Sequence, residues 1–149
     1  MHIQEIIEST EYPEKPIYYF AYGMLTDPDF MGDSTLVGVG TLPNFKFEMF
    51  QHANVVPAAG SKTYGSLWEI NRKLLSTLDM TEGYPYYYDR KNVPVYCNGK
   101  KFEAEVYTMT PESRESSQGT SPKKSYLKRI MTGYHHAGIP LQQLKDSLR

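Results

Sequence analysis

The segment Ile17-Tyr-Tyr-Phe-Ala-Tyr22 limits the folds open to this chain more than any other. Its residues are all apolar or aromatic, so a strand formed here has no polar face and must be covered on both sides. Gly23 follows directly and ends the run, and Thr26 or Asp27 is suited to cap a short helix with Pro28 in its first turn. The chain is therefore expected to build a sheet around a buried central strand.

Further strands are expected in the first half of the chain. They are Thr35–Leu42, Asn44–Phe50 and Thr63–Ile70. The second of these alternates apolar and polar residues with period two, and the glycines of the first allow close backbone approach or a bend in a barrel. The stretch 51–62 lacks such a pattern and is expected to be an irregular loop that could border a pocket. Asn71 is placed to cap a helix over Arg72–Thr81.

Asn98-Gly99 predicts a β-hairpin in the second half of the chain. This dipeptide separates the strand-like runs Asp89–Tyr96 and Lys101–Thr110, and Asn-Gly is the strongest short signal for a tight hairpin turn. Pro94 cannot donate a backbone hydrogen bond, so the first run is expected to lie at an edge or to contain a bulge.

The C-terminal part is expected to be helical after one surface loop. Residues 111–121 are polar and are interpreted as that loop, the best candidate for a mobile lid. Ser121-Pro122 predicts a helix start, and Gly138 predicts its end. Tyr126, Leu127, Ile130, Met131 and Tyr134 form the apolar stripe of this helix. A last short helix is expected from Pro140.

The length of the chain and its lack of internal repeats predict one domain. The chain has 149 residues, enough to bury a single core, and contains no internal repeat. Residues 1–16 are polar and closed off by Pro13 and Pro16, so they are interpreted as an N-terminal arm. Residues 17–149 are expected to form the single domain.

Charge and cysteine usage exclude several classes of function. The net charge is −1, so no general attraction to nucleic acid or to a membrane surface is expected. Cys97 is the only cysteine, which excludes an internal disulfide and favours a reducing compartment. The opening residues are too short and too acidic for a signal peptide, so the cytoplasm is the expected location. His135 and His136 are adjacent and diverge on a helix, so no metal site is expected.

Glu82 is the candidate catalytic residue. It stands where the helical pattern of Arg72–Thr81 meets Gly83, and Tyr84, Tyr86, Tyr87 and Tyr88 follow, interrupted only by Pro85. An acid among aromatic side chains is partly desolvated, which raises its pKa and suits it to proton transfer near neutral pH. The alternative is a solvated acid in the last turn of a helix, which is the commoner case for an acid at such a position.

The turn Tyr22-Gly23-Met24-Leu25 is a candidate anion site. A strand, a glycine turn and a helix start together can present backbone N–H groups to a carboxylate or an oxyanion. A plain strand-to-loop turn is the alternative. No Walker A loop, dinucleotide-binding glycine motif or nucleophilic serine motif is present, so chemistry here would depend on a carboxylate, tyrosines and backbone N–H groups.

Four separated stretches together resemble the gamma-glutamylcyclotransferase family. They are Tyr19-Phe-Ala-Tyr-Gly-Met-Leu25, Gly65-Ser-Leu-Trp-Glu-Ile70, Leu78-Asp-Met-Thr-Glu-Gly83 with Tyr88-x-Arg90, and Ser121-Pro122…Tyr126-x-x-x-Ile130-x-x-Gly133…Gly138-Ile-Pro140. Together, in this order and spacing, the four stretches cover the chain from about residue 18 to its end. With the strand pattern, this resemblance implies an α+β fold: a small mixed, barrel-like sheet with helices packed outside.

The resemblance also implies a reaction. The α-amino group of a γ-glutamyl amino acid, dipeptide or amine would attack its own γ-carbonyl, giving 5-oxoproline and a free amine without a cofactor, as in glutathione metabolism. Glu82 would be the general acid/base, and the backbone N–H groups of Gly23, Met24 and Leu25 would hold a carboxylate or the oxyanion. Tyr22, Tyr107 and Tyr126 match aromatic positions of the family's substrate site. Each of these tyrosines is also explicable as a core residue.

One departure and several alternatives accompany the resemblance. Met24 replaces the hydroxyl residue usual in the family's loop, so a side-chain hydrogen bond is lost there while backbone donors remain. One alternative is a cyclotransferase for γ-glutamylamines, such as an isopeptide or a biosynthetic intermediate. Another is a non-catalytic module that binds a γ-glutamyl group, a carboxylate or a protein. Whether the chain forms a homodimer is left open.

Overall fold

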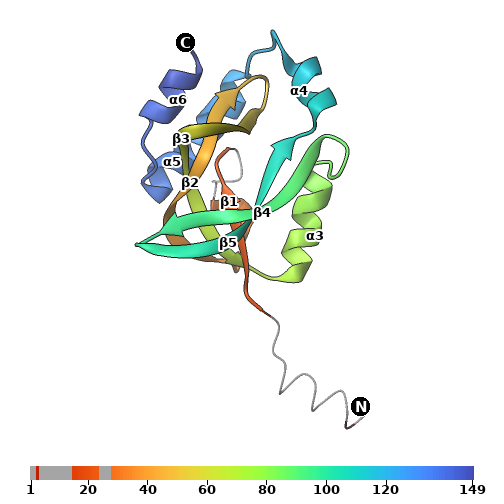
Figure 1. Ribbon diagram of the computed structural model, residues 1–149, viewed down its shortest axis with the longest axis vertical. Coiled ribbons are helices and arrows are strands. Elements are labelled where there is room, and N and C mark those ends of the chain that lie inside the picture. The colour runs from red at the N-terminus through yellow and green to blue at the C-terminus, as the bar shows by residue number, and fades with distance from the viewer. Residues whose placement is uncertain (1–2, 4–14, 24–27) are drawn as a thin grey trace.

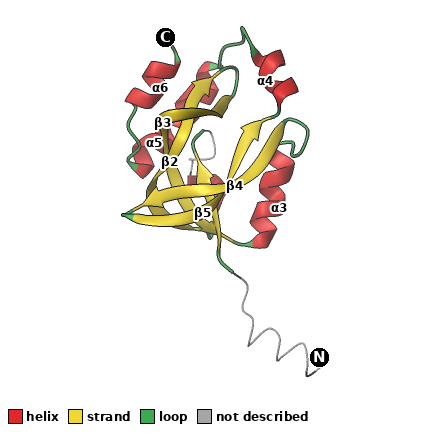
Figure 2. Cartoon of the chain, in the orientation of Figure 1, coloured by secondary structure: helices red, strands yellow, loops and turns green. Residues whose placement is uncertain are grey.

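The computed structural model describes residues 3, 15–23 and 28–149, so most of the expected arm 1–16 lies outside the described residues. The described strands form a closed barrel, with helices packed outside it (Figures 1 and 2). The strands are β1 (Ile17–Ala21), β2 (Thr35–Met49), β3 (Ala53–Ile70), β4 (Tyr88–Cys97) and β5 (Lys100–Met109). The helices are α2 (Pro28–Met31), α3 (Arg72–Thr81), α4 (Pro111–Ser117), α5 (Lys124–Ala137) and α6 (Gln142–Ser147). The predicted α+β, barrel-like fold is confirmed.

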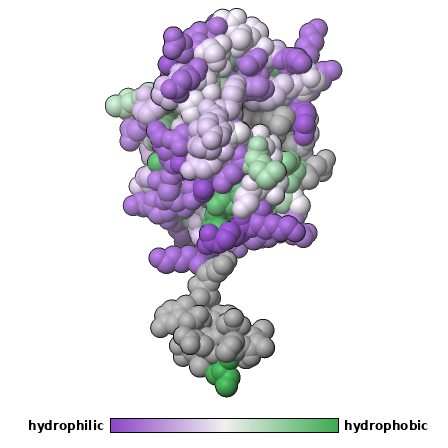
Figure 3. All heavy atoms as spheres, turned by 90° about the vertical axis from the view of Figure 1, so that its right-hand side faces the viewer, coloured by the Kyte–Doolittle hydropathy of each residue, from purple (hydrophilic) through white to green (hydrophobic). Residues whose placement is uncertain are grey.

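The barrel contains both parallel and antiparallel pairs. Its strand order is β1-β3-β2-β4-β5, and it closes where β1 runs parallel to β5, with Tyr18 opposite Ala104. The other neighbours pair antiparallel. In Figure 1, α3 lies on the side of β4, while α5 and α6 lie on the opposite side, near β2 and β3. The face that carries α3 and α4 is mostly hydrophilic, with a smaller apolar area set into it (Figure 3).

Strand β1 is covered on both sides, as its apolar run predicted. Phe20 and Tyr22 belong to a cluster that includes barrel residues and the inner face of α5. Tyr19 and Ala21, which alternate with them, belong to a second cluster under α3. All of these side chains are buried. The strand therefore separates two parts of the core and ends at Ala21, two residues before Gly23.

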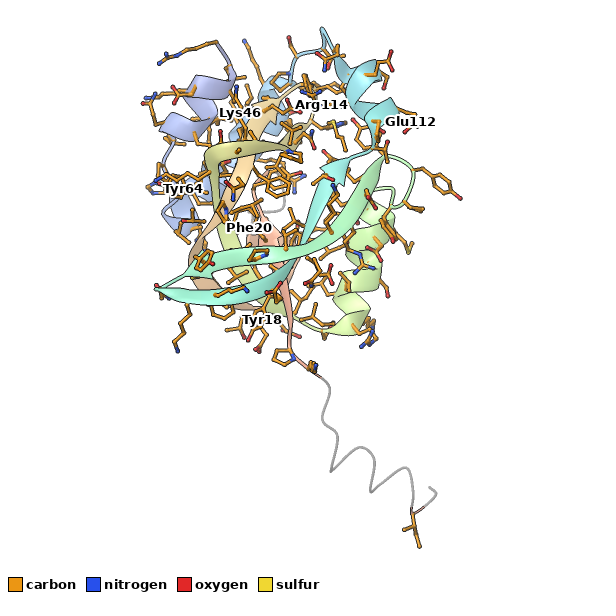
Figure 4. All side chains as sticks on the ribbon, in the orientation of Figure 1. Tyr18, Phe20, Lys46, Tyr64, Glu112 and Arg114 are labelled. Atoms are coloured by element: carbon orange, nitrogen blue, oxygen red, sulfur yellow. The ribbon has the colours of Figure 1, made fainter. Side chains whose placement is uncertain are left out.

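Two glycines make room for the Phe20 ring at the centre of the barrel (Figure 4). Gly40 of β2 and Gly65 of β3 are paired across the sheet. A Cβ on Gly65 would lie 2.4 Å from the Ala21 carbonyl oxygen and 2.6 Å from the Phe20 ring. The close approach predicted for the glycines of Thr35–Leu42 is thus present at Gly40, and Gly65 supplies the opposite half of the space.

The expectation of a loop over 51–62 was wrong. Residues 53–70 form one long strand, β3, and only the short turn before Ala53 separates it from β2. The backbone of the first part of β3 pairs with the end of β2, from Met49 opposite Ala53 to Phe45 opposite Pro57. This pairing decides the conformation, because partner strands override weak intrinsic preference. The segments expected as Thr35–Leu42 and Asn44–Phe50 likewise form one strand, with a register shift near Asn44, whose φ is 64°.

The expectation of a loop over 111–121 was wrong for residues 111–117, whereas 118–121 are irregular as expected. Residues 111–117 form α4, whose N-cap Thr110 accepts a hydrogen bond from the Ser113 amide and whose first residue is Pro111. Arg114 holds α4 against the end of β2 through two hydrogen bonds to Glu48, at 2.7 and 3.0 Å (Figure 4). These cap and ion-pair contacts stabilise a helix too short to be evident from periodicity.

The next helices begin later than predicted. Helix α5 starts at Lys124 rather than at Ser121-Pro122, and α6 starts at Gln142 rather than at Pro140. Both shifts are small. They occur because a sequence pattern locates the ends of a helix less precisely than the helix itself.

Predictions that depended on local chemistry are confirmed. Asn71 caps α3 by accepting a hydrogen bond from the Leu74 amide at 2.8 Å. Asn98 and Gly99 have φ values of 53° and 75° and join β4 to β5. Gly138 ends α5 with a φ of 83°. The bulge considered for Pro94 is absent, since Pro94 lies in β4 opposite Glu103 without a register shift; on its other side β4 pairs with β2 at Tyr96 and not at Pro94. Within the described residues, every helix is too short or too polar to cross a bilayer.

Candidate active site

Glu82 lies at the C-cap of α3, directly before the glycine that ends the helix. Gly83 has a φ of 66°, its amide donates to the Met80 carbonyl, and the Tyr84 amide donates to the Asp79 carbonyl at 2.9 Å. This pair of bonds is the Schellman arrangement that closes a helix at a left-handed glycine. Leu75 and Leu78 anchor the same helix in the core. The backbone at Glu82 is therefore fixed from both sides.

A pocket of about 330 Å³ lies beside Glu82. Its described lining consists of Tyr19, Tyr22, Gly23, His52, Ala53, Met80, Thr81, Glu82, Gly83, Tyr87, Tyr88, Tyr107 and Tyr126. The candidates Tyr22, Gly23, Tyr107 and Tyr126 are thus brought together with Glu82. The candidates Met24 and Leu25 lie outside the described residues. None of the described lining residues comes from 111–121, the segment expected to act as a lid.

The tyrosine hydroxyls of the pocket are fixed by long-range hydrogen bonds. Tyr22 donates to the Tyr107 carbonyl at 2.6 Å, and Tyr88 donates to the Ala53 carbonyl at 2.6 Å. Tyr126 accepts from the Ala53 amide at 2.9 Å. Burial raises the pKa of each of these phenols, so they are neutral at physiological pH. The tyrosine walls of the pocket are consequently uncharged, and their hydroxyls are held in place by hydrogen bonds.

The same surroundings raise the pKa of the Glu82 carboxyl to about 7, because burial penalises its charged form. A carboxyl group with this pKa can accept and return a proton at neutral pH. Tyr87 and Tyr88 of the tyrosine-rich turn contribute to the walls, whereas Tyr84 and Tyr86 are exposed. The other tyrosines of the lining come from β1 and the residue after it, from β5 and from α5. The sequence therefore predicted the kind of environment but only part of the residues that produce it.

The raised pKa of Glu82 predicts a pH dependence of stability. The ordinary value is 4.5, so between pH 4.5 and 7 the folded protein keeps a proton that the unfolded chain has released. Stability from this group is full below pH 4.5 and is lost as the pH rises through 7, by about 3 kcal/mol. Urea unfolding should show Glu82→Gln gaining on the wild type between pH 5 and pH 8. A difference that stays constant with pH would contradict the prediction.

Asp79, one helical turn before Glu82, connects α3 to the barrel. The Tyr107 hydroxyl donates to Asp79 Oδ1 at 2.6 Å, and Arg90 Nε lies 3.0 Å from the same oxygen. Arg90 also approaches Glu105 and lies over the Tyr84 ring. The Arg90 Nε–H does not point along a hydrogen bond, so this contact is an ion pair only. The last turn of α3 is thereby held against β4 and β5.

Tyr107→Phe should therefore lower the free energy of unfolding by about 1.5–3 kcal/mol, the usual value for a hydrogen bond to a charged group. The change removes the bond to Asp79 and keeps the aromatic ring. Chemical denaturation measures the effect, with Tyr96→Phe as the control because Tyr96 is 46% exposed. Equal stability of the two variants would show that the bond to Asp79 contributes nothing.

Sequence reasoning missed several lining residues. Tyr19 and His52 were not named as site residues, and Tyr88 was named only within the tyrosine-rich turn and the Tyr88-x-Arg90 motif. The sequence does offer a signal for Tyr19. Strand β1 ends at the pocket and its side chains alternate between two faces, one with Tyr19 and the other with Tyr22, so Tyr19 could have been named together with Tyr22. For His52 the sequence offers only its place in a stretch expected to border a pocket. Among the described residues, no three His, Cys, Asp or Glu side chains are grouped as a metal site.

Comparison with known proteins agrees with this architecture. Residues 19–128 match the family described as gamma-glutamyl cyclotransferase, AIG2-like. The Bos taurus gamma-glutamylcyclotransferase is 26% identical over 143 residues, which cover 85% of this chain and 74% of the bovine protein. A Methanocaldococcus jannaschii protein that carries gamma-glutamylcyclotransferase as a provisional name is 32% identical over 107 residues, 64% of this chain and 86% of that protein.

Solved structures show the same fold. A gamma-glutamyl cyclotransferase superposes with a TM-score of 0.72 at 24% identity, covering 88% of this chain and 86% of that one. An uncharacterized human protein superposes with a TM-score of 0.75 at 25% identity, covering 89% and 86%. The sequence match, the barrel and the acid-containing pocket agree with one another: this chain belongs to the gamma-glutamyl cyclotransferase, AIG2-like family of cyclotransferase-type proteins.

Proposed function

We propose that the protein converts a γ-glutamyl amide into 5-oxoproline and a free amine, with Glu82 as general acid/base. The observation that carries this proposal is a single carboxyl group with a pKa of about 7 among neutral tyrosines. Family membership supports the reaction type, and the pocket volume is in the range of small-molecule sites.

The proposed reaction takes place within one substrate molecule. Glu82 takes a proton from the α-ammonium group, and the freed amine attacks the γ-carbonyl carbon to form the lactam C–N bond. Collapse of the tetrahedral intermediate breaks the bond to the leaving nitrogen, which receives the proton from Glu82. The new lactam nitrogen then gives up its second proton to the Glu82 carboxylate, which passes it to the released amine. No metal or cofactor is needed, because nucleophile, carbonyl and leaving group share one molecule whose folding over itself supplies much of the rate gain.

The proposed binding roles follow from the fixed groups of the pocket. The turn at Gly23, together with Met24 and Leu25, would supply backbone N–H groups to the substrate carboxylate or the oxyanion. The Tyr126 oxygen accepts the Ala53 amide, which leaves its own proton to donate to the substrate. The hydroxyls of Tyr22 and Tyr107 are engaged with protein groups, so these residues would contribute their rings.

Incubation with γ-glutamyl-alanine and γ-glutamyl-ε-lysine tests the proposal directly. Release of 5-oxoproline from either substrate, detected by chromatography, supports cyclotransfer. If the protein binds these compounds without releasing 5-oxoproline, it is a binding module and the proposed function fails. We expect the reaction to take place in a reducing compartment such as the cytoplasm, where Cys97 stays a thiol.

A further inference from the structure

Three tyrosine hydroxyls of the pocket donate away from Glu82. Tyr22 and Tyr88 each donate to a backbone carbonyl at 2.6 Å. The Tyr107 hydroxyl donates to Asp79 Oδ1, also at 2.6 Å. A phenol has one proton, so a hydroxyl engaged in this way is not a donor to the Glu82 carboxylate. Tyr107 differs from the other two because its acceptor is a side chain, which a single substitution can remove.

The ion pair of Asp79 with Arg90 fixes the direction of the Tyr107 bond. Arg90 and Tyr107 lie opposite each other in β4 and β5, and Arg90 Nε is 3.0 Å from the Asp79 oxygen that accepts the Tyr107 hydroxyl. Arg90 Nη1 is also 3.5 Å from Glu105, so two carboxylates hold the guanidinium in place. An ionised carboxylate has no proton to donate, so the proton of the hydrogen bond comes from Tyr107.

The Tyr107 hydroxyl connects this ion pair with Glu82. Tyr107 and Glu82 both line the pocket, whereas Asp79 and Arg90 are not among its described lining residues. Burial raises the pKa of the Tyr107 phenol most, followed by the bond to Asp79 and the Asp79 charge. The Arg90 charge lowers this pKa, and the Glu82 charge raises it. Charges on both sides of the pocket wall therefore act on one hydroxyl, and a Tyr107 proton released by Asp79 has the Glu82 carboxylate as an alternative acceptor.

We propose that Asp79 is a positioning residue for Glu82: it keeps the Tyr107 proton directed out of the pocket, so that the Glu82 carboxylate stays without this donor and remains the stronger base. Arg90 holds Asp79 in place. The inference rests on the proposed function, because it concerns the strength of the base in that reaction. A hydrogen bond from a phenol would stabilise the charged form of Glu82 and lower its pKa. Burial raises this pKa to about 7, and Asp79 preserves the effect of burial by withholding the donor.

The other titratable groups of the pocket come from β1 and the residue after it, from the turns before β3 and β4, from β4 and from α5. Burial lowers the pKa of His52, whose Nδ1 lies 2.9 Å from the Tyr87 hydroxyl, so the imidazole is neutral at pH 7. Burial raises the pKa of the remaining phenols that face the pocket, so these do not change charge near pH 7: Tyr19, Tyr22, Tyr88 and Tyr126.

Asp79→Leu tests the inference in the substrate-free protein. Leucine is similar to aspartate in size but cannot accept the Tyr107 proton. The titration of the Glu82 carboxyl carbon is followed by NMR in isotope-labelled protein, and Glu82→Gln identifies its signal. We expect the midpoint to fall by about one pH unit or more. Asp146→Leu is the matched control: it removes an exposed ion pair with Arg149 on α6, on the opposite side of the barrel from α3, and should leave the midpoint unchanged.

Tyr107→Phe separates the proton from the charge of Asp79. Loss of the Asp79 charge acts through space and would lower the midpoint with or without the Tyr107 hydroxyl. In the Tyr107→Phe background, Asp79→Leu should therefore shift the midpoint at most about half as far as in the wild type. Asp79→Asn is the milder variant where folding is a concern. It should shift the midpoint in the same direction but less far, because its amide oxygen can still accept the Tyr107 proton.

The same change should appear in the reaction. In Asp79→Leu, the pH at which kcat/KM for 5-oxoproline release from γ-glutamyl-alanine rises should move down together with the NMR midpoint. The plateau kcat should fall several-fold, because a weaker base takes the α-ammonium proton less readily. A purely structural role of Asp79 would lower kcat without moving the pH profile. Circular dichroism confirms folding of each variant.

The outcomes separate this inference from the proposed function. No shift in Asp79→Leu, or equal shifts with and without the Tyr107 hydroxyl, overturns the inference. A clear rise of the midpoint in Tyr107→Phe alone also overturns it, because Tyr107 would then donate to Glu82 in the wild type. Absence of 5-oxoproline from γ-glutamyl-alanine and γ-glutamyl-ε-lysine overturns the proposed function instead, and the NMR titration still decides where the Tyr107 proton is directed.

Discussion

Glu82→Gln is expected to reduce 5-oxoproline release by about 10²–10⁴-fold, the usual contribution of a positioned general acid/base. Glutamine keeps the size of the side chain and its place at the C-cap, but it cannot take the proton of the α-ammonium group. The loss should appear in kcat, because the γ-glutamyl group is held by other parts of the pocket. Steady-state kinetics with the best γ-glutamyl substrate measures it.

The same residue should set the pH profile. Because the Glu82 pKa is raised to about 7, kcat/KM should rise with pH through this value as the base is released. Glu112→Gln on the exposed surface of α4 is the matched control and should behave as the wild type. If Glu82→Gln kept activity within about threefold of the wild type, another group would have to be the base.

Gly65→Ala is expected to lower the free energy of unfolding by about 3 kcal/mol or more, at the upper end of overpacking effects. Its Cβ would lie 2.4 Å from the Ala21 carbonyl oxygen, a backbone atom that cannot rotate away. The Phe20 ring blocks the other direction at 2.6 and 2.8 Å. Since β1 leads directly to Tyr22 and Gly23, the displacement should also disturb the pocket. Chemical denaturation and 5-oxoproline release measure the two effects.

Gly60→Ala provides a control in the same strand. Gly60 has a φ of 81° and open space around its Cα, so an added methyl group costs only the left-handed strain of about 1–2 kcal/mol. Gly65→Ala should be clearly the less stable variant. Equal stability would show that the barrel relaxes around Gly65 and that the close approach to Phe20 is not essential.

Local predictions succeeded where a residue acts on its own turn. Asn71, the Asn98-Gly99 pair and Gly138 need only their neighbours to cap a helix or close a hairpin, so the sequence specified them. The expectation of loops over 51–62 and over the first part of 111–121 was wrong for the opposite reason. The first segment is extended because β2 supplies its hydrogen bonds, and Arg114 of α4 is paired with Glu48, far away in sequence.

The sequence alone determined that the chain has an apolar central strand and that Glu82 lies at a glycine-ended helix beside tyrosines. These features follow from periodicity and from the backbone freedom of Gly83. Only the tertiary structure decided which side chains surround the acid. Tyr19, His52 and Tyr126 reach it from separate elements once the barrel has closed and the strand register is set. The raised pKa of Glu82 arises from that assembled burial, because desolvation depends on all neighbours in space and not on neighbours in sequence.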